Sequence, residues 1–258
     1  MSFDNIELAR WLGHSVGEFD VRTVAIAVIC KTPVPGQSKT RLSPPLQPEE
    51  CAALSACFIR DVTRTIGQLA GRGDVTGYAL YTPEGSEAAL RALLPEGFVL
   101  IPQAGGDFSA RLVRSFEALL QAGHGGVIVV NADSPTLPLL ILRAAVGAVR
   151  RGDNVVLGPA HDGGYTLIGL SKTHPRLFEE IPWSTSEVYR LTLDRAHEIG
   201  LPVVNVPAWY DVDDQASLRM LEDELAGRPP AFAVTAGADA PSTRQFLRER
   251  QAAQPRNN

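Results

Sequence analysis

The segment GVIVVNADSP, residues 126–135, decides the expected fold. Four β-branched residues in a row, with a glycine before them and a proline after, predict a short strand that is buried on both faces. Polar residues follow at once, and the prolines at positions 135 and 138 prevent further strand pairing. In an open parallel sheet, ligands bind just beyond the carboxyl ends of the strands. The end of this strand is therefore a candidate binding position.

Two polar residues at this position have the chemistry of a metal ligand. The carboxylate of Asp133 and the amide oxygen of Asn131 could hold a divalent cation, because Mg²⁺ and Mn²⁺ prefer oxygen ligands. The alternative is that Asp133 and Ser134 cap the following helix, which we expect from Leu139 to Arg151. The segment alone leaves both interpretations open.

The composition excludes several classes of protein. The chain has 258 residues, 45% of them hydrophobic, with no apolar run long enough for a membrane span. A formal charge of -5 gives no general attraction to nucleic acid or anionic lipid. The three cysteines have no metal-binding spacing, which predicts reduced, structural thiols and a cytoplasmic location. An oligomer is left open.

The order of the predicted elements indicates an α/β fold. Strands and helices alternate up to residue 152, which predicts a doubly wound, mostly parallel sheet between helices. The predicted strands at 154–159 and 165–170 are too close for a helical crossover, so the second must turn back. We expect an extension at residues 1–20, one domain at 21–226, and a poorly ordered tail at 227–258.

The loop after the first predicted strand, CKTPVPGQSKTRL at residues 30–42, is basic. A glycine, its neighbouring amides and several cations at the carboxyl end of a strand suit a polyphosphate. The loop lacks the GxxxxGK(S/T) pattern, which disfavours a P-loop NTPase. The alternative is an ordinary solvated turn. The residues that we assign to phosphate binding are Lys31, Pro35, Gly36, Lys39 and Arg41.

Further polar residues follow later strands. Gln103 lies in a glycine-containing loop after a strand, and the amides of Gly163 and Gly164 could meet an anionic group of a substrate. Three carboxylates, Asp211, Asp213 and Asp214, precede a short helix, and such a cluster is costly unless it is solvated, caps a helix or faces a cation. Two more residues are candidates for substrate contact, although turn formation and helix capping also explain them: Asp162 and Ser184.

Three separated motifs occur together: KTPVPG with KTRL at 31–42, NADSP at 131–135, and GPAHDGGY at 158–165. With PWSTS at 182–186 and DVD at 211–213, they resemble the bacterial "transferase 1" family of glycosyltransferase-like proteins, which is associated with radical-SAM/selenodomain proteins. That family belongs to the nucleotide-diphospho-sugar transferase superfamily. The resemblance implies a GT-A, Rossmann-like α/β/α fold with a mostly parallel central sheet.

The basic loop, Asp133 and the Asp-Gly-Gly turn are also similar to those of 2-phospholactate guanylyltransferase, a more distant likeness. Carried over by position, this resemblance implies that Asp133 and Asp213 are the metal carboxylates, with Asp211 as the competitor for the second role. The sequence departs from the usual Asp-x-Asp motif by having Asn131 first. It also lacks the long glycine-rich loop of sugar nucleotidyltransferases.

We therefore expect a metal-dependent transferase that uses a nucleotide-activated donor, either a nucleoside triphosphate or a nucleotide sugar. The basic loop favours a triphosphate and hence nucleotidyl transfer with release of pyrophosphate, whereas the family resemblance favours glycosyl transfer. The acceptor would be a small molecule that carries phosphate or carboxylate. A catalytically inactive nucleotide-binding regulatory module is the alternative of another class. The residues expected in catalysis are Lys39, Arg41 and Asp133.

Overall fold

The computed structural model describes residues 23–70, 73–103 and 105–253. Within these ranges seven strands form one sheet in the order β3-β2-β1-β4-β6-β5-β7. The strands are β1 (Val24–Lys31), β2 (Val75–Thr82), β3 (Val99–Pro102), β4 (Gly126–Asn131), β5 (Val155–Pro159), β6 (Tyr165–Leu170) and β7 (Val203–Asn205). The helices are η1 (Thr40–Leu42), α2 (Pro48–Ala70), α3 (Glu87–Arg91), α4 (Phe108–Gln121), α5 (Leu139–Val149), η2 (Pro175–Phe178), α6 (Val188–Glu198), α7 (Gln215–Leu225) and α8 (Pro241–Ala253). The extension expected at residues 1–20 lies outside the described residues.

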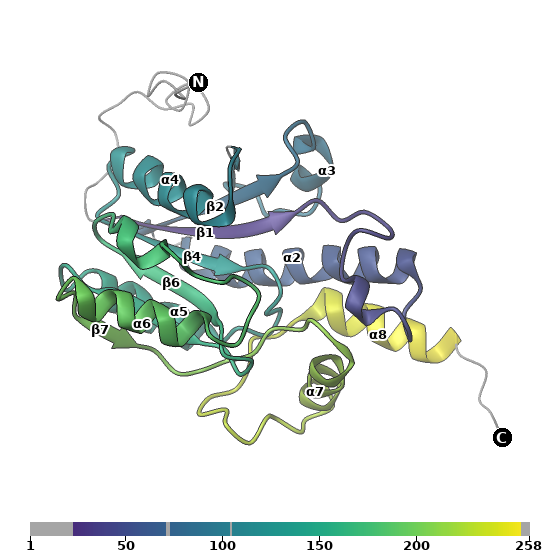
Figure 1. Ribbon diagram of the computed structural model, residues 1–258. Coiled ribbons are helices and arrows are strands. Elements are labelled where there is room, and N and C mark those ends of the chain that lie inside the picture. Colours follow the sequence, from purple (N-terminus) through teal and green to yellow (C-terminus); the bar gives the residue numbers. More distant parts are fainter. Residues whose placement is uncertain (1–22, 71–72, 104, 254–258) are drawn as a thin grey trace.

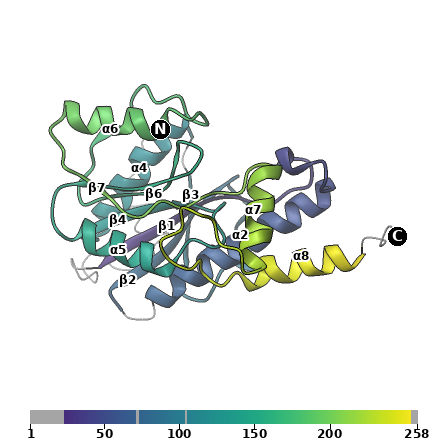
Figure 2. The ribbon, with the colours of Figure 1, turned by 90° about the horizontal axis from the view of Figure 1, so that it is seen from below.

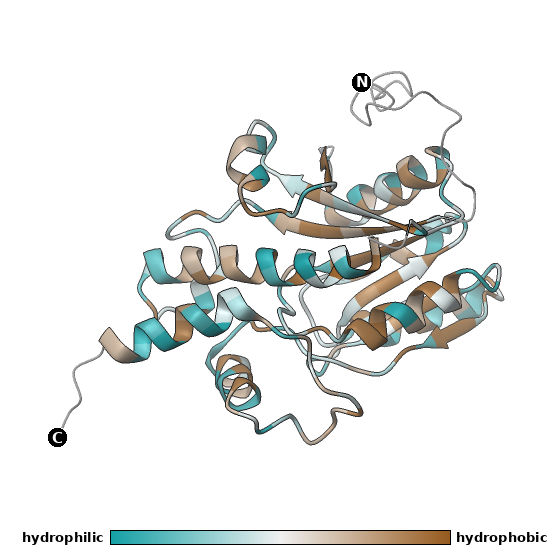
Figure 3. Ribbon diagram, turned by 180° about the vertical axis from the view of Figure 1, so that it is seen from behind, coloured by the Kyte–Doolittle hydropathy of each residue, from teal (hydrophilic) through white to brown (hydrophobic). Residues whose placement is uncertain are grey.

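Helices cover both faces of the sheet, so the molecule has three layers (Figures 1 and 2). One apolar core joins the sheet to α2, α5, α7 and α8, and the other joins it to α4, η2 and α6. In Figure 3 the strands are mostly hydrophobic, whereas the helices mix hydrophobic and hydrophilic residues. This pattern follows from burial of a strand on both faces and of a helix on one. Within the described ranges, no helix is both long and apolar enough to cross a membrane.

Strand β4 has the central place that its sequence predicts. Val127 and Val129 point into one core, and Ile128 and Val130 point into the other, all at most 3% exposed. The strand pairs in parallel with β1 and antiparallel with β6. The predicted return of the chain after β5 is thereby confirmed, because β6 lies antiparallel between β4 and β5.

The carboxyl-terminal region corrects our expectation of a poorly ordered tail at 227–258. Residues Pro241–Ala253 form α8, which packs along α2 (Figures 1 and 3). Asp61 of α2 is fully buried, and its carboxylate accepts hydrogen bonds from the amides of Ser242 (3.1 Å) and Thr243 (2.8 Å). The start of α8 is thus capped by a side chain that is distant in sequence.

A buried histidine near the start of β4 gives a pH-dependent prediction. His124 is 4% exposed and lies 2.7 Å from the hydroxyl of Tyr78 and 2.9 Å from that of Thr23. Burial lowers the pKa of His124 to about 4. Between pH 6.5 and 4 the unfolded chain therefore binds a proton that the folded chain does not. We expect this residue to lower the free energy of unfolding by about 1.4 kcal/mol per pH unit as the pH falls through that window.

The measurement is urea unfolding at several pH values between 7 and 4. In the His124→Gln variant the loss of stability toward low pH should be shallower than in the wild-type protein, because the substituted side chain takes up no proton. Equal pH slopes for the two proteins would contradict the assignment.

Candidate functional site

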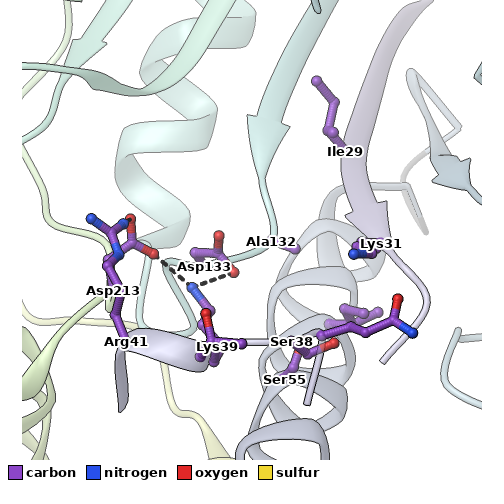
Figure 4. A pocket seen from close by; sticks show the side chains of 12 residues that line it. Ile29, Lys31, Ser38, Lys39, Arg41, Ser55, Ala132, Asp133 and Asp213 are labelled. Carbon is purple, nitrogen blue, oxygen red and sulfur yellow. Dashed lines mark hydrogen bonds and ion pairs between the residues drawn. The ribbon is translucent and has the colours of Figure 1, made fainter. Parts of the chain in front are cut away.

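A pocket of about 270 Å³ lies beside the carboxyl ends of β1 and β4 (Figure 4). The basic loop after β1 forms one wall, α2 forms another, and the segment after β4 closes it. The pocket therefore lies where the sequence predicts a ligand site. Its lining residues are Ile29, Lys31, Gln37, Ser38, Lys39, Thr40, Arg41, Ser55, Ile59, Ala132, Asp133 and Asp213.

The loop holds a fixed path through local hydrogen bonds. Gly36 has φ of 72°, a conformation that glycine adopts without strain, and the amides of Gln37 and Ser38 both donate to the carbonyl of Val34. The buried hydroxyl of Ser38 accepts a hydrogen bond from the amide of Val34 (3.0 Å). Gly36 thus shapes the loop, while the side chains that line the pocket come from the residues around it.

Lys39 is the most enclosed charged group of the pocket. Its backbone is left-handed (φ 49°, ψ 40°), and its side chain is 7% exposed. The ammonium lies 2.7 Å from Oδ1 of Asp133 and 2.8 Å from Oδ1 of Asp213 (Figure 4). It also donates to the carbonyl of Val212 at 2.8 Å. Burial by itself would lower the pKa of Lys39, but the two carboxylates outweigh burial and raise the pKa above its ordinary value.

The three carboxylates at 211–214 have three different environments. Asp214 caps α7 by accepting from the amide of Ser217 at 2.9 Å. Asp213 pairs with Lys39 and also with Arg41, whose Nη2 lies 2.7 Å from Oδ2 of Asp213. Among the described residues no cation pairs with Asp211, and burial together with the carboxylates of Asp162, Asp213 and Asp133 raises its pKa to about 7.

Asp133 does not cap the helix that follows it. Helix α5 begins at Leu139 after Pro138, and no side chain accepts a hydrogen bond from its first turn. The carboxylate of Asp133 instead faces Lys39, while Oδ1 of Asn131 accepts from the amide of Asp133 at 3.3 Å. The capping interpretation of Asp133 and Ser134 is therefore wrong, which leaves the pocket as the environment of this carboxylate.

Of the residues predicted to bind ligand, the structure brings five together around the pocket, namely Lys31, Lys39, Arg41, Asp133 and Asp213. The remaining candidates do not line it, namely Pro35, Gly36, Gln103, Asn131, Asp162, Gly163, Gly164 and Ser184. The Nε2 atom of Gln103 is buried and has no hydrogen-bond partner among the described residues.

The Asp-Gly-Gly turn between β5 and β6 differs from our expectation. The amide of Gly164 donates to Asp162 (2.9 Å) and that of Gly163 donates to the carbonyl of Ala160 (3.3 Å), so both are used inside the turn. Gly163 has φ of 93° and approaches the backbone of Ser186 so closely that a Cβ would lie 2.3 Å from the carbonyl oxygen. These glycines are explained by the turn and its packing.

Helix capping, one of the explanations for Ser184, is also not observed. Helix α6 begins at Val188, and no side chain caps its first turn. The exposed Ser184 has φ of 65°, and the carboxylate of Glu187 pairs with Arg190 at 2.5 Å. A capping box would need the carboxylate of Glu187 to accept from a backbone amide, but this carboxylate pairs with Arg190 instead.

Sequence reasoning missed several residues of the pocket. Ser55 and Ile59 reach it from α2, where the helical periodicity gives no sign of a ligand site. The carbonyl of Val212 could not be recognised either, because any residue supplies a carbonyl. A signal was available for Gln37, Ser38 and Thr40, which lie between the cations of the predicted loop.

The donor set of the pocket fits a divalent cation that is shared with phosphate. Within residues 23–70, 73–103 and 105–253, no group of three His, Cys, Asp or Glu side chains is arranged to hold a metal ion. The carboxylates of Asp133 and Asp213 nevertheless converge on one atom, the ammonium of Lys39. Two carboxylates suit Mg²⁺ or Mn²⁺ when waters and substrate phosphates supply the other ligands.

Comparison with solved structures identifies the fold. A protein from Desulfovibrio desulfuricans G20, whose name proposes a nucleotide-diphospho-sugar transferase, is 26% identical, with a TM-score of 0.75 over 89% of this chain and 95% of that protein. The fold is GT-A-like. CMP:2-keto-3-deoxy-manno-octonic acid synthetase in complex with CTP has a TM-score of 0.51 at 13% identity, over 80% of this chain and 99% of that one.

A third solved structure shares the fold. This is 4-diphosphocytidyl-2C-methyl-D-erythritol synthase from Anaerococcus prevotii, with a TM-score of 0.51 at 8% identity, over 80% of this chain and 100% of the other. Residues 65–185 match the family described as "Uncharacterized protein conserved in bacteria (DUF2064)". Among curated proteins, none matches the chain at a significant level. The predicted α/β fold with a mostly parallel sheet is confirmed, whereas the radical-SAM association and the guanylyltransferase likeness stay predictions.

Proposed function

We propose that this protein is a metal-dependent transferase that uses a nucleotide-activated donor, and that its reaction is nucleotidyl transfer. The carrying observation is that a basic loop and two carboxylates share one pocket at the carboxyl ends of β1 and β4. Cations suit the phosphates of a nucleotide, and carboxylates suit the metal that accompanies them. The names of the GT-A-like relatives support the same class, because they describe a nucleotide-diphospho-sugar transferase, a 4-diphosphocytidyl-2C-methyl-D-erythritol synthase and a CMP:2-keto-3-deoxy-manno-octonic acid synthetase in complex with CTP.

The charges favour a triphosphate over a diphosphate. Three cations, Lys31, Lys39 and Arg41, line the pocket, and the side chain of Arg41 is 69% exposed and faces Asp213 with only part of its guanidinium. Arg41 and the exposed Lys31 would hold the terminal phosphates, which leave as pyrophosphate. A nucleotide sugar has only two phosphates and would offer Arg41 and Lys31 fewer phosphate oxygens to contact.

In the reaction that we propose, an ionised phosphate or carboxylate oxygen of the acceptor, which carries no proton, attacks the α-phosphorus of the triphosphate and forms a new P–O bond. The bond from the α-phosphorus to the bridging oxygen of the β-phosphate breaks, and pyrophosphate leaves with the electron pair. Asp133 and Asp213 would hold Mg²⁺ or Mn²⁺, which when bound neutralises charge on the phosphate oxygens. The amides of the Asp-Gly-Gly turn donate hydrogen bonds inside the turn, so they are not available to an anionic acceptor. The carboxyl group of Asp211 supplies no positive charge to it either. An acceptor that carries phosphate or carboxylate stays a prediction.

Glycosyl transfer is the second candidate, and the relative from Desulfovibrio desulfuricans favours it by its name. There an acceptor would attack the anomeric carbon of a nucleotide sugar, and a nucleoside diphosphate would leave. The same pocket would then hold the diphosphate. Binding without turnover would instead indicate a regulatory module.

The deciding experiment is an assay of the released product. The protein is incubated with each nucleoside triphosphate, Mg²⁺ and pooled small metabolites, and pyrophosphate is measured. Parallel reactions contain nucleotide sugars and are assayed for nucleoside diphosphate. Pyrophosphate above the protein-free background supports our proposal. Nucleoside diphosphate without pyrophosphate favours glycosyl transfer, and a rise in melting temperature without either product favours the regulatory module.

A further inference from the structure

The ammonium of Lys39 has no N–H group left for a phosphate. An ammonium has three N–H donors. In this structure Asp133, Asp213 and the carbonyl of Val212 accept from it, all at 2.7–2.8 Å. A lysine in the predicted phosphate loop is therefore fully engaged with acidic and carbonyl oxygens. It can contact phosphate only after it gives up some of these partners.

The same carboxylates are the ones that a metal would need. A magnesium ion lies about 2.1 Å from each ligand oxygen. Oδ1 of Asp133 and Oδ1 of Asp213 both contact the ammonium, so an ion bound between them would overlap the position of Nζ. The other oxygen of Asp213 pairs with Arg41 at 2.7 Å. Asp213 thus has both of its oxygens paired with cations from this chain.

The lysine can leave without rearrangement of the sheet. Its ammonium is carried by a flexible four-carbon side chain, and Nζ lies 5.7 Å from the centre of the Phe58 ring. Lys39 itself lies in the loop, directly before η1, and not in a strand. Rotation of the side chain would move the charge from the carboxylates toward the pocket that Lys39 already lines.

We propose that Lys39 is a tethered cation that competes with the divalent metal for Asp133 and Asp213 and passes to phosphate when the metal binds. This inference rests on the metal site of the proposed function. Bare metal must then displace the lysine and binds weakly. Metal that arrives with a polyphosphate binds more tightly, because the released ammonium gains a new anionic partner. Metal and phosphate are thereby coupled through one side chain.

The test measures Mn²⁺ binding to the nucleotide-free protein by electron paramagnetic resonance. In Lys39→Met the competing charge is gone, and we expect Mn²⁺ to bind at least about tenfold more tightly than in the wild type, as the loss of a charged hydrogen bond implies. The matched control is Lys31→Met, which removes the same charge from an exposed residue of the same pocket. Its Mn²⁺ affinity should change less than about threefold.

A second titration uses inorganic tripolyphosphate, which needs no knowledge of the base. Tripolyphosphate should increase Mn²⁺ affinity in the wild type, and this increase should shrink by about tenfold in Lys39→Met. The double variant Lys39→Met/Asp133→Asn should bind Mn²⁺ more weakly than Lys39→Met alone. This loss would show that Asp133 is a ligand of the metal. Lys39→Gln serves as the second variant if the methionine variant does not fold, and its melting temperature is measured alongside.

Equal Mn²⁺ affinities in the wild type and both Lys39 variants would overturn the inference, as would the absence of Mn²⁺ binding from all of them. These results do not depend on turnover. If no triphosphate yields pyrophosphate but Lys39→Met still tightens Mn²⁺ binding, the proposed reaction fails and the competition stands. If pyrophosphate forms but the affinities are equal, the competition fails and the reaction stands.

Discussion

Replacing Asp61 by alanine is expected to destabilise the protein by about 3 kcal/mol and to detach α8 from α2. The substitution removes the acceptor of two amides at the start of α8, those of Ser242 and Thr243, at a fully buried position. Loss of a helix cap costs about 1 kcal/mol, and a buried amide without a partner costs about 1–3 kcal/mol. A loss of about 3 kcal/mol corresponds to a fall in melting temperature of roughly 6–12 °C.

Limited trypsin digestion reports detachment separately from global unfolding. Helix α8 contains Arg244, Arg248 and Arg250, so detachment should expose these sites and speed their cleavage. The control is Asp239→Ala, because Asp239 is 68% exposed and its pairs with Arg64 and Arg244 measure 3.7 and 3.9 Å. Such pairs contribute less than about 1 kcal/mol. Unchanged melting and cleavage in Asp61→Ala would show that the cap by Asp61 is not needed to hold α8 against α2.

Helix α8 also supports the pocket from outside. Arg250 pairs with Glu50 at 3.1 Å and donates to the carbonyl of Pro45 at 3.0 Å, and Gln215 of α7 donates to the carbonyl of Pro44 at 2.8 Å. The two carboxyl-terminal helices thus contact residues 44–50, the segment that follows the basic loop and η1. The region that we expected to be a tail therefore packs against the segment between the basic loop and α2.

The difference between prediction and structure at α8 has a physical cause. The strands could be predicted because each is a run of apolar residues whose burial depends little on its partner, as in β1 and β4. The segment around α8 lacks such a run, and its stability comes from tertiary partners. Its cap, Asp61, lies 182 positions before Thr243, and its buried Leu247 packs in a core formed by earlier elements. Such contacts between distant residues cannot be predicted from composition or local periodicity.

The sequence predicted where the candidate site lies, but not which side chains in it form ion pairs and hydrogen bonds with one another. The basic loop and Asp133 follow β1 and β4, and parallel pairing of these strands brings their carboxyl ends together. The inward turn of Lys39 could not be read from the sequence, because it depends on a left-handed backbone at a residue other than glycine. The different roles within the acidic cluster could not be predicted from the sequence either. Asp214 caps α7, whereas Asp213 faces Lys39.

Replacing Asp133 by asparagine is expected to remove most of the metal-dependent activity and to leave the fold intact. The carboxylate is 38% exposed, and an amide of nearly the same size can still accept a hydrogen bond from Lys39. It cannot supply the charge that a divalent cation needs. A bound metal contributes several kcal/mol to the transition state, so the rate of pyrophosphate release should fall by about 10²–10⁴-fold, and Mn²⁺ affinity should fall with it.

The matched control for this prediction is Asp214→Asn, which makes the same chemical change next to Asp213. Asparagine caps a helix as well as aspartate does, so α7 should keep its cap and the variant should keep its activity. The two variants have equal net charge, and a general electrostatic effect would therefore slow both alike. A rate that falls only in Asp133→Asn, at an unchanged melting temperature, assigns the metal to the pocket. If Asp133→Asn keeps its magnesium dependence and rate, the metal is held elsewhere. Among the described residues, only Asp133 shares the ammonium of Lys39 with Asp213, so no other carboxylate could replace it in this pocket.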